Sequence, residues 1–112
     1  MKDLKSRTKE FALRVIRLFA ALPKTTEAQV IGKQLLRSGT SVGAHYREGM
    51  RARSDAEFIS KIEGGLQELE ESCYWMEFMK KIIRVTPLEG KIVAVVFSDG
   101  LSGSIRCRPL LP

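Results

Sequence analysis

Few residues of this 112-residue chain have the types and spacing that catalysis requires. The single histidine, His45, has no cysteine near it in sequence, so neither a metal site nor a nucleophile–base pair is indicated. Cys73 and Cys107 lack the CxxC spacing of a zinc or redox site, and we expect free thiols. The segment Gly39–Gly43 is similar to a phosphate loop but lacks its lysine and its preceding strand. These residues predict no enzyme activity, no cofactor and no metal.

Carboxylates gather in one later segment of the chain. They are Glu63, Glu68, Glu70, Glu71 and Glu77. A di-iron helical bundle uses such glutamates, but it also needs a Glu-x-x-His pair repeated on two helices. That pairing is absent from the sequence, so the carboxylates do not indicate a di-iron site.

What remains is a set of basic residues able to contact phosphate together. Arg47 and Arg51 are four residues apart and share a helical face. Several weak phosphate contacts add up to salt-sensitive affinity for nucleic acid, without sequence-specific reading. The alternative is a solvated face, or ion pairs with an acidic segment of another subunit. The candidate nucleic-acid-binding residues are Arg14, Arg17, Lys33, Arg37, Arg47, Arg51 and Arg53.

Composition and charge describe a folded, basic protein. Hydrophobic residues make up 44% and charged residues 29%, the balance of a single globular domain, here residues 1–112. The net charge of +6 is uneven, because residues 1–53 carry 12 Lys/Arg against 4 Asp/Glu and residues 54–83 carry 3 against 7. The basic half either faces an acidic partner or packs beside the acidic segment. Without a long apolar stretch or an apolar signal segment, we expect a cytoplasmic protein and no membrane partner.

Apolar residues at helical spacing predict three long helices. They span about residues 3–22, 27–52 and 55–84. Pro23 ends the first helix, because proline disfavours helical geometry in the residue before it. Thr25 and Thr26 can each cap the second helix, and Ser54 with Glu57 forms a capping box at the start of the third.

Two of these helices contain residues that disfavour a helix. The second runs through the small residues 38–44, where each glycine costs about 1 kcal/mol. Its apolar stripe keeps register from Leu35 to Val42, so we expect one continuous helix that lets a neighbouring helix approach closely. The third contains Gly64-Gly65, at a cost of roughly 2 kcal/mol.

The third helix also carries more apolar surface than one bundle interface requires. Its predicted seam follows steps of three and four residues and consists of Ile59, Ile62, Leu66, Leu69, Cys73, Met76 and Ile83. Phe58, Trp75, Phe78 and Met79 lie beside or across from that seam. A second buried face, against another subunit, would account for them.

The last segment predicts a fourth helix at about residues 88–98, short or irregular, and an irregular tail at 99–112. Its β-branched residues also fit a strand, but a lone strand is unstable. The predicted fold is therefore all-α, an antiparallel up-down-up-down four-helix bundle that assembles as a homo-oligomer.

Three stretches of the sequence resemble a known family. They are RSGTSVGAHYRE at residues 37–48, RARSDAEF at residues 51–58, and Glu68 to Glu71 with Tyr74-Trp75. Together they are similar to the bacterial four-helix bundle proteins encoded in intervening sequences of 23S ribosomal RNA genes. The residues that match the family motifs are Ser38, Ser41, Tyr46, Glu48, Glu68, Glu71, Tyr74 and Trp75, beside Arg37 and Arg47. His45 and Gly64-Gly65 depart from the family pattern, which usually has asparagine and better helix formers there.

The resemblance implies a homopentamer arranged as a barrel, and kinship with the accessory variability protein of diversity-generating retroelements. That protein associates with a reverse transcriptase and nucleic acid. The family brings no established activity. We therefore expect a non-enzymatic oligomeric scaffold that binds RNA or DNA. The alternative is an adaptor that docks a partner protein, such as a reverse-transcriptase-like protein, with no direct role in nucleic-acid binding.

Overall fold

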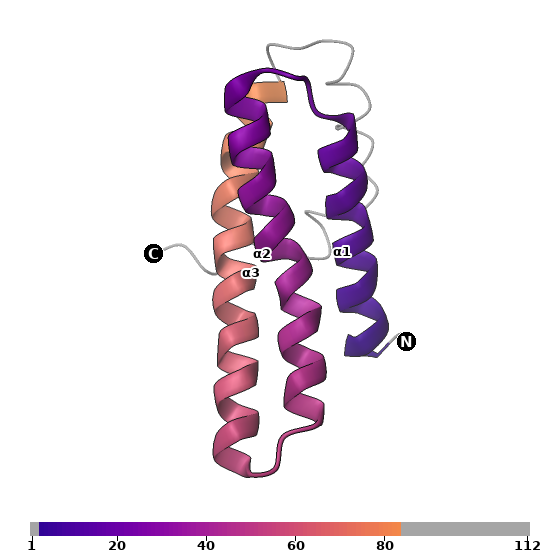
Figure 1. Cartoon of the computed structure of the whole chain (residues 1–112), viewed down its shortest axis with the longest axis vertical. Helices are drawn as coiled ribbons and strands as arrows, with labels where there is room; N and C mark the ends of the chain where they lie inside the picture. Colours follow the sequence, from indigo (N-terminus) through magenta and orange to yellow (C-terminus); the bar gives the residue numbers. More distant parts are fainter. Residues whose placement is uncertain (1–2, 84–112) are drawn as a thin grey trace.

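The computed structural model describes residues 3–83, which form three helices joined by short connections (Figure 1). Helix α1 spans Leu4–Ala21, α2 spans Thr26–Met50 and α3 spans Asp55–Ile83. Each end lies within two residues of its predicted position. The helices run up, down and up, and α2 packs against both α1 and α3. The described part of the chain contains no strand, which confirms the all-α prediction there.

The predicted fourth helix at 88–98 and the tail at 99–112 lie outside the described residues. Within residues 3–83, no helix is long and apolar enough to cross a membrane.

The helices begin at side chains that accept hydrogen bonds from the first turn. Asp3 accepts from the Ser6 amide at 2.8 Å, and Thr25, rather than Thr26, accepts from the Ala28 amide at 3.3 Å. Ser54 accepts from the Glu57 amide at 3.1 Å, while the Glu57 carboxylate accepts from the Arg53 amide at 3.1 Å. These bonds satisfy donors that have no partner inside a helix. Local sequence therefore sets where each helix starts.

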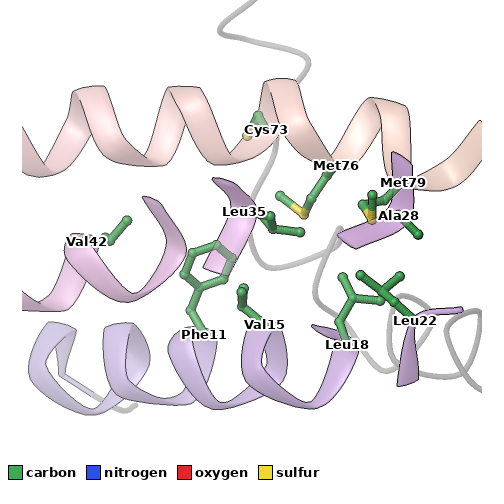
Figure 2. Packing of buried hydrophobic residues seen from close by; sticks show 10 residues of the cluster. All are labelled: Phe11, Val15, Leu18, Leu22, Ala28, Leu35, Val42, Cys73, Met76 and Met79. Carbon is green, nitrogen blue, oxygen red and sulfur yellow. The ribbon is translucent and has the colours of Figure 1, made fainter. Parts of the chain in front are cut away.

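The apolar core lies between all three helices (Figure 2). Its buried members are Phe11, Val15, Leu18, Leu22, Ala28, Leu35, Val42, Cys73, Met76 and Met79. Leu35 and Val42 of α2 belong to the stripe predicted there, and Phe11, Val15 and Leu18 of α1 recur at helical spacing. Cys73 is buried in this core, whereas Cys107, the other cysteine of the thiol prediction, lies outside the described residues.

The predicted seam of the third helix is only partly right. Met79, expected beside the seam, is fully buried, whereas Ile59 and Leu66 of the seam are 53% and 58% exposed. Cys73 and Met76 of the seam are buried as predicted, and the buried side extends to Met79 because α2 packs against the side of α3 that carries Ser72 and Met79. A helix with apolar residues on several sides does not reveal which side its neighbour covers.

Glycines of α2 bring α1 close. A Cβ at Gly39 would lie 2.9 Å from Val15 Cγ2, and one at Gly43 would lie 3.1 Å from Thr8 Oγ1. A Cβ at Gly39 would require Val15 to shift, and one at Gly43 would require Thr8 to move by a few tenths of an ångström. Residues 38–44 lie within α2, so the small-residue stretch is part of one continuous helix, as predicted. Its small side chains allow α1 to approach closely.

Candidate functional site

Family-motif residues of α2 and α3 form a polar network on the surface between the two helices. From α2, Arg37 Nη1 lies 3.3 Å from Glu68 Oε1, and Arg37 Nη2 pairs with Glu71 Oε2. Trp75 Nε1 donates to the same Glu71 oxygen at 2.9 Å. The three α3 residues are three and four positions apart, so they share one face of that helix. The network joins α2 to α3 through charges that remain partly accessible.

The network shifts the ionisation of its members. The Trp75 indole donor, followed by the Arg37 guanidinium, holds the pKa of the Glu71 carboxyl below its usual range. The hydrogen bond to Glu71 raises the pKa of Arg37. Arg37 is therefore a cation already neutralised by two carboxylates, which makes it a poor phosphate ligand.

A buried hydrogen bond lies directly beneath this network. Ser38 and Ser72 are both completely buried, and their hydroxyl oxygens lie 2.9 Å apart. Ser72 also lies 2.8 Å from the Glu68 carbonyl, and Ser38 lies 3.3 Å from the Leu35 carbonyl. This buried hydrogen bond gives the motif residue Ser38 a structural role, because it links α2 to α3. The role of Ser72 is not evident from the sequence, in which its only signal is a small polar residue one position from the predicted apolar seam.

His45 fills a space that Gly64 leaves open. A Cβ at Gly64 would lie 2.9 Å from both Cε1 and Nδ1 of His45, so no larger residue fits beside this ring. His45 Nε2 lies 3.8 Å from Glu68 Oε2, and its buried Nδ1 has no hydrogen-bond partner among residues 3–83. Thus two departures from the family pattern, His45 and Gly64, contact each other. The geometry indicates a packing role for His45 rather than that of a catalytic base.

The seven candidate nucleic-acid-binding residues separate into two groups. Arg47, Arg51 and Arg53 are exposed and lie at the end of the molecule where α2 connects to α3 (Figure 1). The others are distributed over the helices: Arg17 is exposed on α1, Arg14 is half-buried on α1, Lys33 is exposed on α2, and Arg37 lies in the polar network. The structure therefore brings three of the seven together.

The remaining motif residues contact other parts of the same chain or are half-buried. Ser41 donates to the Arg37 carbonyl at 2.7 Å, Glu48 pairs with Lys61 at 3.1 Å, and Tyr46 is half-buried. Tyr74 is 52% exposed and packs edge-to-face against Trp75, with ring centroids 4.9 Å apart.

No metal or hydrolase site appears within residues 3–83. These residues contain no group of three potential metal ligands. The segment Gly39–Gly43 also fits the G-x-S-x-G pattern of a hydrolase nucleophile elbow, which requires a sharp turn from strand to helix. Here it lies inside continuous helix, so the match carries no catalytic meaning.

The helix order, the glycine-mediated contact and the polar network define a small antiparallel helical protein. Residues 3–91 match the family described as 23S rRNA-intervening sequence protein, and the chain belongs to that family. It is also similar to the crystal structure of a protein of unknown function from the S23 ribosomal protein family of Bacteroides thetaiotaomicron VPI-5482. The two are 34% identical, with a TM-score of 0.68, over 93% of this chain and 99% of the other. Among curated proteins, none matches the chain.

Proposed function

We propose that this protein is a non-enzymatic, oligomeric scaffold that binds RNA or DNA through phosphate contacts. The observation that carries the proposal is the group of exposed arginines Arg47, Arg51 and Arg53 at one end of the molecule. None of the three forms an ion pair with another residue of the described range. Guanidinium groups left unpaired in this way suit the planar, charged oxygens of a phosphate.

Oligomerisation makes such a small group of arginines effective. Each phosphate contact releases bound counterions, and the slope of log affinity against log salt is about −0.9 per contact on duplex DNA. An assembly multiplies the three arginines of each subunit, so weak contacts sum. The family resemblance makes a pentamer the favoured assembly, and the exposed apolar residues of α3 support an oligomer.

The test compares two doubly neutralised variants with the wild type. Binding of labelled structured RNA and of duplex DNA is followed by fluorescence anisotropy from about 50 to 200 mM salt, a range in which phosphate contacts weaken strongly. We expect Arg51→Gln/Arg53→Gln to lose about tenfold or more in affinity and to show a shallower salt slope. Lys24→Gln/Lys81→Gln removes the same charge from exposed positions elsewhere and should lose much less. Absence of wild-type binding at the lowest salt, or equal losses in both variants, would contradict the proposal.

A protein-interaction adaptor is the second candidate, and the aromatic cluster of α3 favours it. Tyr74 lies in edge-to-face contact with Phe78, at 5.0 Å between ring centroids, and both rings are exposed. Exposed aromatic groups are typical of protein-binding surfaces. An adaptor would keep its partner protein in a pull-down when Arg47→Glu/Arg51→Glu is introduced, and its wild type would bind neither RNA nor DNA.

A further inference from the structure

The outer side of α3 carries a regular seam that the described residues leave uncovered. Its members are Ile59, Glu63, Leu66, Glu70, Tyr74 and Glu77, spaced by steps of four, three, four, four and three residues. All six are exposed, and apolar residues alternate with glutamates along the line. Such spacing places them on one face of the helix. We call this face the acidic seam.

The outer side of α1 has the opposite charge. Lys5, Lys9 and Arg17 are exposed there, together with Leu13 and Ile16, which are 47% and 44% exposed. The one carboxylate within α1, that of Glu10, is half-buried. We call this group the basic face. It offers apolar contact area flanked by cations, as the acidic seam offers apolar area flanked by anions.

Within one chain, the acidic seam and the basic face cannot contact each other. Helices α1 and α3 both pack on α2, with the apolar core between them, and the exposed faces point away from that core. Two copies can join them. A contact between two acidic seams would oppose Glu63, Glu70 and Glu77 to one another, and a contact between two basic faces would oppose lysines, so like-with-like pairing is unfavourable.

We infer that the acidic seam of one copy binds the basic face of the next copy. This inference deepens the oligomeric part of the proposed function and is independent of whether nucleic acid binds. A contact between two different faces is heterologous, so each subunit uses one face toward each of two neighbours. Repetition of that contact closes into a ring when the rotation allows it, and otherwise extends as a filament.

The test reverses the charge of each face and then of both. Native mass spectrometry and light scattering of the full chain report subunit number over a range of concentrations. We expect Lys5→Glu/Lys9→Glu and Glu63→Lys/Glu70→Lys each to weaken assembly by about tenfold or more, because like charges then meet. The chain carrying all four changes should reassemble, because opposite charges meet again. All four positions are exposed, and circular dichroism checks that each variant is folded.

A matched control and separate outcomes keep the inference distinct from the proposed function. Lys24→Glu/Lys33→Glu changes net charge as much as the basic-face variant does, at exposed positions off both faces, and should assemble as the wild type. Unchanged assembly in both face variants, or no recovery in the fourfold variant, would refute the contact while leaving the oligomer intact. A wild type that is monomeric throughout would refute the contact and the oligomeric scaffold together. Loss of folding stability without loss of assembly would show that the chain itself covers the seam, and would also refute the contact.

Discussion

Helix α2 contacts its two neighbours in two different ways. Toward α1 it presents Gly39 and Gly43, and the two helices approach so closely that an added Cβ would touch Val15 or Thr8. Toward α3 it presents Ser38 and Arg37, which bond to side chains across the contact. The contact with α1 depends on the absence of side chains at these two glycines, whereas the contact with α3 depends on paired polar side chains, beside the space that Gly64 leaves for His45.

This difference determines how each contact should fail. A close apolar contact is sensitive to added volume, because packed interiors have little free space. A polar contact is sensitive to the removal of one partner, because the other is then left buried without a hydrogen bond. Substitutions chosen on these two grounds can separate the contacts experimentally.

The largest effect should come from filling the α1 contact. Gly39→Leu places a side chain against Val15, which is completely buried and stiff, and should lower the free energy of unfolding by about 3 kcal/mol in urea denaturation. Ala44→Leu adds a comparable side chain at an exposed position of the same helix and should change stability by less than about 0.5 kcal/mol. Similar losses in the two variants would mean that α1 does not pack as closely as the structure shows.

The second prediction concerns the buried pair of serines. Ser72→Ala should cost about 1 kcal/mol of unfolding free energy, because a buried hydrogen bond is lost and the Ser38 hydroxyl loses one partner. Ser38→Ala/Ser72→Ala should cost less than the sum of the two single changes, since each single change already removes the bond between the two hydroxyls and the double change removes it only once. A double-mutant cycle by urea denaturation measures the coupling, and strict additivity would argue against the hydrogen bond.

The third prediction compares two adjacent glycines of α3. Gly64→Ala should destabilise by about 1 kcal/mol, because the new methyl group meets the His45 ring. Gly65→Ala should stabilise by up to about 1 kcal/mol, because its Cβ would lie at an ordinary 3.4 Å from His45 Cβ and the helix gains propensity. Thermal unfolding of both variants gives the two signs. With His45→Ala added, Gly64→Ala should become stabilising too, and a persistent loss would contradict the packing role of His45.

The smallest effect should be the pH dependence of the surface network. Because the pKa of Glu71 is lowered by Trp75 and then Arg37, its contribution is present above the pKa of an unfolded glutamate, about 4.3, and is lost as pH falls through the lower folded value. Glu71→Gln should therefore lose less stability between neutral and acid pH, by under about 1 kcal/mol for a pair this exposed.

Denaturation at several pH values measures that difference. Trp75→Phe, which removes the indole donor, should shift the pH dependence in the same direction by a smaller amount. An unchanged pH profile in Glu71→Gln would mean that the network contributes nothing.

The helices could be predicted because their signals are local. Caps at Thr25 and Ser54, the stop at Pro23 and the register from Leu35 to Val42 all involve residues within one or two turns of each other. The family resemblance then identified the motif residues.

The partners within the site could not be predicted in the same way. Arg37 pairs with residues 31 and 34 positions later, and local patterns do not set the register between two helices. For that reason the sequence predicts Arg37 as a phosphate ligand, whereas in the structure it pairs with Glu68 and Glu71. The buried side of α3 was predicted only in part because Ile59, Leu66 and Met79 are all apolar, and the packing of the neighbouring helices decides which of them is buried.

The unequal lengths of the helices have a further consequence at the α2–α3 connection. Helix α1 has 18 residues against 25 in α2 and 29 in α3, so the α2–α3 hairpin extends past the start of α1 (Figure 1). Residues 53–60 there are all exposed, and a segment with so little buried surface opens locally at a low free-energy cost. The backbone amides of this end should exchange with solvent faster than those beside the core. Arg53 lies in this segment and Arg51 two residues before it, so both lie where the described part of the chain can adjust its shape to an irregular phosphate backbone.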